Sequence, residues 1–305
     1  MVESYLDARL ELLRRTQNAD GGWGYFPGKQ SWLEPTSYAV LALRGRDDHA
    51  AARGWELIKS WQLSDGSWRP AGQVRTESWG TALGVTLSTI YAPREAVFTR
   101  GLDWLLRTTG ADSNWLNKIV TRLHLSGVDS DASLEGWPWK PGTSAWIEPT
   151  AHALVALKKA SALASSEGLE RRVRVGEEMI WNRRCADGGW NYGNHAVLRV
   201  DLPSYPETTA IALLGLQGRP RTELASPLDL ARKLAGQTRS LARAWLSICL
   251  RIYNLEPVPT SGEQSTPAPD LMLAALEALG APGGNAGLLA VSSSANRPEK
   301  PKERG

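Results

Sequence analysis

The chain has 305 residues, of which 42% are hydrophobic and 22% are charged, and its formal net charge at pH 7 is +3. This balance predicts an ordinary globular protein and excludes a strongly basic nucleic-acid-binding surface. Two cysteines cannot form a disulfide framework, and the start, MVESYLDARL, has no apolar signal core. No apolar stretch is long enough to span a membrane. We therefore expect a cytoplasmic protein without a nucleic-acid partner, and peripheral contact with a membrane stays open.

Tryptophan is unusually frequent, with 14 Trp against 2 Phe, which indicates that one Trp-bearing motif is repeated. Residues 22–43 read GWGYFPGKQSWLEPTSYAVLAL, and residues 136–157 read GWPWKPGTSAWIEPTAHALVAL. Two further copies contain Trp68 and Trp190, and a degenerate copy lies at residues 112–115. In three clear copies a Thr follows the Trp after thirteen residues, and in the copy of Trp190 a six-residue insertion lengthens this spacing; these residues are Thr36, Thr81, Thr150 and Thr209.

Each copy predicts the same pair of helices. An amphipathic outer helix ends at a Gly-rich turn, a Trp follows, and Glu-Pro-Thr or an equivalent starts an inner helix that is apolar on nearly every face. Such a pair cannot bury its own apolar surface, so neighbouring pairs must stack side by side. We predict outer helices near 2–16, 47–61, 94–108, 168–183 and 226–236, and inner helices near 35–44, 79–90, 149–163, 207–217 and either 238–253 or 268–279.

The predicted fold class is all-α. Five or six pairs that close in a ring give an α/α toroid, an α6/α6-type barrel of helix–Trp turn–helix repeats, and an open right-handed solenoid is the alternative. We assign residues 1–280 to a single toroid domain with parallel inner helices. Residues 281–305 are rich in Gly, Ser, Pro and charge, and we expect them to form a disordered C-terminal tail.

Residues 17–23 (QNADGGW) and 62–68 (QLSDGSW) resemble the QW motif of the prenyltransferase and squalene oxidase repeat superfamily, which includes squalene–hopene and other terpenoid cyclases. The resemblance covers about residues 5–220. It departs from the motif at Arg184, which stands where the motif has Gln, and at residues 112–115, which lack both Gln and Gly. It implies a cyclase-like toroid that holds an apolar, isoprenoid-like molecule. Squalene cyclases resemble two such barrels in one chain, so a second barrel-forming chain is a further expected partner.

The family places its catalytic acid in a D-x-D-D-T-A motif at the start of an inner helix. In that register this chain has Glu34, Glu148 and Glu207, one carboxylate where the family has two adjacent ones. One interpretation is helix capping, because a helix N-terminus stabilises a carboxylate. The other is catalysis by a glutamate whose pKa is raised by burial or by a neighbouring carboxylate. The insertion before Glu207 makes its copy the least regular, so Glu207 is the first candidate acid.

Two groups of aromatic residues have different predicted roles. Trp23, Trp68, Trp137 and Trp190 are predicted to be structural, with each indole packed between neighbouring repeats. Tyr38 and His152 hold matching positions just inside two inner helices and are candidates for lining the cavity, although a satisfied core role is the alternative. The remaining candidates for substrate binding flank the same rim and are Trp32, Trp79, Trp146 and Tyr205.

A catalytic metal is not expected. Cys185, Asp187 and His195 match the residue types that bind zinc in protein prenyltransferases, but they lie in one loop rather than on inner helices. We therefore predict no metal and no cofactor. A stripe of apolar residues at 115–123 fits either a membrane-surface helix or the core face of a barrel helix.

Two functional classes remain open. In the first, the chain cyclises or isomerises a polyprenyl or triterpene-type molecule in the central cavity, as an intramolecular isomerase similar to class II terpene cyclases. In the second, it is a non-catalytic relative that binds an isoprenoid or a protein. The missing paired aspartates favour the second class, and the glutamates at the rim favour the first.

Overall fold

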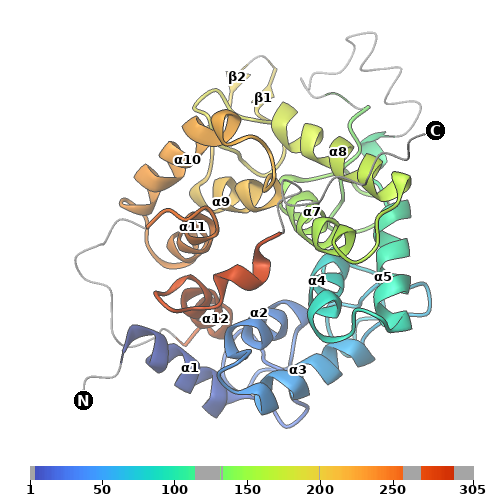
Figure 1. Ribbon diagram of the computed structural model, residues 1–305, viewed down its shortest axis with the longest axis vertical. Helices are drawn as coiled ribbons and strands as arrows, with labels where there is room; N and C mark the ends of the chain where they lie inside the picture. Colours follow the sequence, from blue (N-terminus) through green and yellow to red (C-terminus); the bar gives the residue numbers. More distant parts are fainter. Residues whose placement is uncertain (1–3, 114–130, 132, 199, 257–268, 292–305) are drawn as a thin grey trace, which may run out of the picture.

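The computed structural model describes residues 4–113, 131, 133–198, 200–256 and 269–291, and it is almost entirely helical. Amphipathic helices form the outer layer of the molecule (Figure 1). They agree with the predicted outer helices, except that α10 starts at Arg221 and not near residue 226. Pro227 therefore lies inside this helix and not at its start. The outer helices are α1 (Tyr5–Thr16), α3 (Asp48–Ser60), α5 (Ala96–Arg107), α8 (Glu167–Asn182) and α10 (Arg221–Ala235).

The inner helices form a closed ring. Consecutive inner helices pack against each other around the ring, and the contact between α12 and α2 closes it (Figure 1). The chain is therefore an α/α toroid and not an open solenoid. Both segments that we considered for the last inner helix are helical. The inner helices are α2 (Leu33–Leu43), α4 (Thr81–Tyr91), α7 (Ile147–Ser161), α9 (Pro206–Gly215), α11 (Ser240–Ile252) and α12 (Leu271–Gly280).

The Trp of each repeat joins neighbouring helix pairs. The indole N–H of Trp23 donates to the carbonyl of Leu13 in α1 at 2.8 Å, and its ring lies against Gly54 of the next outer helix, α3. Its backbone N–H donates to Oγ1 of Thr36 at 2.9 Å, which fixes the Trp to the first turn of α2. The structural role predicted for these indoles is confirmed, because the same two hydrogen bonds recur at Trp68, Trp137 and Trp190.

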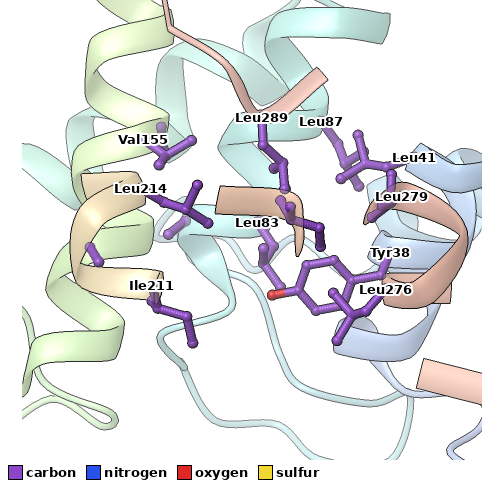
Figure 2. Close-up of a cluster of buried hydrophobic side chains, with 14 of the residues drawn as sticks. Tyr38, Leu41, Leu83, Leu87, Val155, Ile211, Leu214, Leu276, Leu279 and Leu289 are labelled. Carbon is purple, nitrogen blue, oxygen red and sulfur yellow. The ribbon is translucent and has the colours of Figure 1, made fainter. Parts of the chain in front are cut away.

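The C-terminal segment differs from the expected disordered tail. Residues 281–291 pack against the inner helices and include a short 3-10 helix, η2 (Ala286–Leu289). Leu289 is buried among side chains of α2, α4, α7, α9 and α12 (Figure 2). The Asn285 amide donates to the carbonyls of Leu41, Ala42 and Arg44 at the end of α2. Composition predicted disorder because it does not reveal the contacts that Leu289 and Asn285 make with helices distant in sequence. Residues 292–305 lie outside the described part of the chain.

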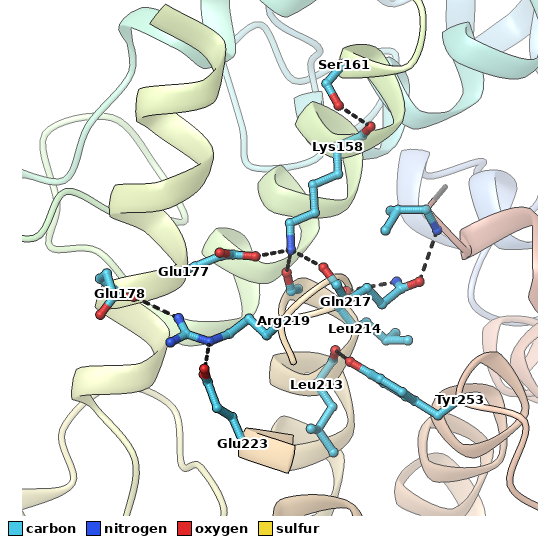
Figure 3. A network of polar contacts seen from close by, with 12 residues as sticks. Lys158, Ser161, Glu177, Glu178, Leu213, Leu214, Gln217, Arg219, Glu223 and Tyr253 are labelled. Atoms are coloured by element: carbon cyan, nitrogen blue, oxygen red, sulfur yellow. Dashed lines mark hydrogen bonds and ion pairs between the residues drawn. The ribbon is translucent and has the colours of Figure 1, made fainter. Parts of the chain in front are cut away.

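Polar contacts hold the carboxyl ends of the inner helices. Lys158 near the end of α7 donates to the carbonyls of Gly215 and Gln217, at 2.6 and 2.5 Å, and pairs with Glu177 of α8 (Figure 3). The Gln217 side chain donates to the carbonyl of Leu289 and accepts from a backbone N–H of the C-terminal segment. This end of the toroid is therefore closed by the chain itself.

The insertion before α9 forms a short hairpin. Strands β1 (Ala196–Val197) and β2 (Val200–Asp201) pair antiparallel, beside α8 and α10 at the edge of the ring (Figure 1). The hairpin exposes Leu198 and Val200, at 75% and 62% of their surface. The predicted fold class was all-α. Among the residues that the structure describes, this short hairpin is the one sheet, with two residues in each strand.

Candidate functional site

The inner helices start at one end of the ring, which we call the mouth. Backbone hydrogen bonds link the turns there in a chain. The N–H of Leu33 at the start of α2 donates to the carbonyl of Pro70, and the N–H of Ile147 at the start of α7 donates to that of Tyr192. Two equivalent bonds, from Trp79 to Trp139 and from Leu271 to Tyr25, continue the pattern. The mouth is thus a connected rim of turns, each carrying the residues that we predicted as site residues.

The structure brings the three predicted glutamates to this mouth. Glu34, Glu148 and Glu207 are each the second residue of an inner helix, and each is half-buried. One helical turn further along lie Tyr38, His152 and Ile211, which are buried in the barrel. Residues four apart share a helix face, so the glutamates lie on the faces that line the axis. Capping alone does not require a carboxylate on that face.

Glu148 has the most perturbed carboxyl of the three. Burial, with the negative charges of Glu34 and Glu207, raises its pKa from 4.5 to about 8. Among the residues that the structure describes, no hydrogen-bond or ion-pair partner is found for its side chain. A carboxyl with this pKa is mostly protonated and neutral at pH 7. It can therefore donate a proton, which an ordinary surface glutamate at this pH cannot.

Glu34 has a different environment. The hydroxyl of Tyr25 donates to its Oε2 at 2.6 Å. Burial raises the pKa of Glu34, the hydrogen bond from Tyr25 lowers it, and the charge of Asp270 raises it. Asp270 is the N-cap of α12, where its side chain accepts from the N–H of Leu273 at 3.0 Å. Sequence analysis missed Asp270, although an Asp directly before the apolar run LMLAAL is a helix-start signal.

Glu207 is hydrogen-bonded in the same manner as Glu34. The hydroxyl of Tyr192 donates to its Oε1 at 3.4 Å, and the rings of Tyr192 and Tyr205 lie 4.9 Å apart. Both tyrosines are exposed. The choice of Glu207 as the first candidate acid stays a prediction, and the raised pKa of Glu148 makes Glu148 a second candidate.

The predicted aromatic residues also lie at the mouth. Trp32, Trp146 and Tyr205 are the residues directly before α2, α7 and α9, in extended backbone conformation. Trp146 and Tyr205 are exposed at 37% and 38%, whereas Trp32 is half-buried with its ring 6.2 Å from that of Tyr25. These rings give the rim an aromatic surface beside its carboxyls.

Below the mouth, aromatic side chains meet inside the ring. The hydroxyl of Tyr38 on α2 lies 3.5 Å from Nε2 of His152 on α7, and both rings pack against Trp245 of α11. These three helices are not neighbours, so their side chains meet across the interior, where Figure 2 shows Tyr38. Trp79 also contacts this group, with its ring centre 5.2 Å from that of His152 and the two planes tilted. Sequence analysis missed Trp245, because α11 carries no Trp-turn motif to mark its register.

His152 is neutral in this cluster, because burial lowers its pKa to about 4. A neutral imidazole between aromatic rings places no positive charge below the glutamates. His152 is buried one helical turn below Glu148, and its predicted role in lining a cavity stays a prediction.

The three residues with zinc-ligand chemistry do not form a site. Asp187 accepts from the backbone N–H groups of Gly189 and Ser204, at 3.1 and 3.0 Å. Its carboxylate therefore stabilises the backbone around this Gly-rich turn. In the described part of the chain no three His, Cys, Asp or Glu side chains are grouped so as to hold a metal ion. The absence of a metal or cofactor remains a prediction.

The structure leaves the membrane question open. No helix within the described ranges is long and apolar enough to cross a bilayer. The apolar stripe at 115–123 falls outside the described residues, so its predicted membrane face is untested.

Comparison with solved structures supports the toroid fold. The type II terpene cyclase MstE from Scytonema is 15% identical with a TM-score of 0.52, over 81% of this chain and 71% of that chain. A variant of the same cyclase, in complex with its substrate geranylgeranyl dihydroxybenzoate, is 13% identical over 90% and 76%, also at 0.52. The endo-beta-1,4-glucanase CMCax from Acetobacter xylinum is 12% identical with a TM-score of 0.57, over 95% and 98%. No protein-family model and no curated protein matches the sequence. At these identities the likeness concerns the fold alone.

Proposed function

We propose that the mouth binds an elongated isoprenoid-like molecule and that Glu148 protonates one of its double bonds, which starts an intramolecular cyclisation or isomerisation. The observation that carries this proposal is the state of Glu148, a neutral carboxyl beside Glu34 and Glu207 in an aromatic rim. A general acid must hold its proton at working pH and lie beside the substrate. MstE, which shares the fold, has been captured with a geranylgeranyl substrate.

The charges around the mouth support a cationic intermediate. Protonation of an alkene leaves a positive charge on carbon, and aromatic faces and carboxylates both stabilise such a charge. The charges that act on Glu148 are both negative, and His152 beneath it is neutral. A carboxyl of high pKa is a weak acid, so stabilisation of the cation by this environment must supply much of the driving force.

The proposed reaction takes up one proton and releases one proton, and both transfers involve glutamates of the mouth. Glu148 transfers its proton to an alkene carbon and becomes a carboxylate. The resulting cation forms its new carbon–carbon bond or shifts its double bond, and then loses a proton to Glu34 or Glu207. Exchange with solvent water restores the starting protonation, so the product is an isomer of the substrate and no cofactor is consumed.

Isotope incorporation tests the proposal. The protein is incubated in D₂O with linear isoprenoids such as geranylgeranyl derivatives, and products are analysed by mass spectrometry. We expect an isomeric product that carries one deuterium per turnover, and we expect Glu148→Gln to abolish it. Glu56→Gln, at an exposed site on α3, is the matched control and should behave like the parent. Turnover that survives in Glu148→Gln contradicts the assignment of the acid.

A glycoside hydrolase is the second candidate. A protonated carboxyl near a carboxylate is the catalytic pair of such enzymes, and the exposed rings of Trp146, Tyr192 and Tyr205 offer flat surfaces on which a sugar could stack. The fold is shared with an endoglucanase. New reducing ends from cello-oligosaccharides, lost in Glu148→Gln, would favour this candidate over the cyclase.

The non-catalytic alternative predicts a ligand without a product. Lipids that copurify with the protein and are recovered unchanged, with no deuterium uptake, would support an isoprenoid-binding relative. A second barrel-forming chain, peripheral membrane contact and a cytoplasmic location remain part of the proposal. The exposed hairpin residues Leu198 and Val200 are the described apolar side chains best placed for such contact.

A further inference from the structure

The residue two positions after each repeat Trp has the same backbone role in all four copies. These residues are Tyr25, Pro70, Trp139 and Tyr192, and each carbonyl accepts from the backbone N–H at the start of another inner helix. The donors are Leu271, Leu33, Trp79 and Ile147, at distances of 2.8 to 3.1 Å. Because the backbone is fixed in this way, the side chain at this position is presented to the rim in an equivalent manner.

In two copies this side chain is a tyrosine that donates to the glutamate of its own repeat. Tyr25 donates to Glu34 at 2.6 Å, and Tyr192 donates to Glu207 at 3.4 Å. A hydrogen bond to a carboxylate favours its charged form. At Glu34 the hydrogen bond from Tyr25 lowers the pKa, against the raising effects of burial and of the Asp270 charge.

The copy that contains Glu148 has Trp139 at this position, and an indole has no hydroxyl to donate. The ring of Trp139 instead packs edge-on against Trp79, with ring centres 5.1 Å apart. Trp79 itself stands where the second copy would have its glutamate. Glu148 is thus the glutamate of the three that lacks a phenol from its own repeat.

We propose that Trp139 is a positioning residue, because it leaves the Glu148 carboxyl without the phenol hydrogen bond that Tyr25 and Tyr192 give to Glu34 and Glu207. The three equivalent positions are in this way divided into one carboxyl without a phenol partner and two carboxyls with one. The inference rests on the proposed function for its purpose, but the difference in hydrogen bonding exists in the resting protein and its effect is measured there.

Carboxyl and phenol groups from neighbouring elements interact with Glu148. Glu34 and Glu207 act on it from α2 and α9, and its own charge acts on the hydroxyls of Tyr25, Tyr38 and Tyr192. His152 lies one turn below on the same helix and is neutral. Trp79, which lies just before α4, carries no titratable group.

Infrared spectroscopy of the resting protein tests the inference without substrate. A protonated carboxyl gives a carbonyl-stretching band that a carboxylate lacks, and subtraction of the Glu148→Gln spectrum assigns the band to Glu148. We expect Trp139→Tyr to supply the missing phenol and to lower the pH midpoint of this band by about one unit or more. That shift is a tenfold increase in proton dissociation. Trp139→Phe, which keeps a ring but has no hydroxyl, should keep the parental midpoint.

The reciprocal variant removes a phenol from another repeat. Tyr25→Phe should raise the midpoint of Glu34, so that a second protonated carboxyl is seen near neutral pH. The inference is overturned if Trp139→Tyr and Trp139→Phe titrate alike, or if Tyr25→Phe leaves the spectrum unchanged. Either result can occur with isoprenoid turnover present or absent, so failure of the inference and failure of the proposed function are distinguished.

Discussion

Two buried ionisable side chains on α7 lie in opposite surroundings. Lys158, at the closed end of the barrel, pairs with Glu177 and donates to two backbone carbonyls, so its buried charge is compensated. Glu148, at the mouth, has only negative charges acting on it. An uncompensated buried carboxyl reduces stability when it ionises, and such groups cluster where proteins do chemistry. The contrast within one helix is the reason we propose a function at the mouth.

The pH dependence of stability follows from Glu148. In the unfolded chain it ionises near 4.5, whereas in the folded protein its pKa is raised to about 8. Between these values the folded state binds more protons, so the free energy of unfolding falls as pH rises through this window. The lowered pKa of His152 affects stability only below about pH 6.5. Urea unfolding at pH 6.5 and pH 8 should show a loss in the parent and a smaller loss in Glu148→Gln; equal losses would contradict the raised pKa.

At the scale of the element, the repeat was predictable because its chemistry is local. Gly21 and Gly66 have φ of 94° and 95°, a left-handed backbone that glycine adopts without strain. The side-chain amides of Gln17 and Gln62 tie these turns to the first turn of the next outer helix. The pattern did not reveal that a glycine on the next outer helix makes room for the ring of the repeat Trp. Gly101 on α5, for example, lies against the ring of Trp68.

Gly101 should be intolerant of a side chain. A Cβ there would lie 2.5 Å from the ring of Trp68, which is fully buried and held by its indole N–H. In a free helix Gly→Ala gains up to about 1 kcal/mol. We expect Gly101→Ala to destabilise instead, by about 1–3 kcal/mol from overpacking. Gly168→Ala, in open space at the start of α8, is the control and should be neutral or stabilising. Equal melting temperatures for both would refute the packing role of Gly101.

At the scale of the whole molecule, sequence reasoning gave the ring and its mouth but not the closed end. The repeated Glu-Pro-Thr starts put Glu34, Glu148 and Glu207 on one rim, because parallel inner helices share a direction. The surroundings of these carboxyls depend on burial, on the charges of one another and on the tyrosines of the repeat turns, which repeat matching does not reveal. The segment at 281–291 was missed for a similar reason, since Leu289 is buried by five helices distant in sequence.

The central claim is that Glu148 is a neutral carboxyl at the mouth of a toroid. NMR of the protein with ¹³C-labelled glutamate side chains measures this directly, with the Glu148 carboxyl signal assigned by its loss in Glu148→Gln. We predict a titration midpoint near pH 8, about where the raised pKa lies. A midpoint near 4.5, the ordinary value for a glutamate, would contradict the claim and leave Glu148 as a helix cap.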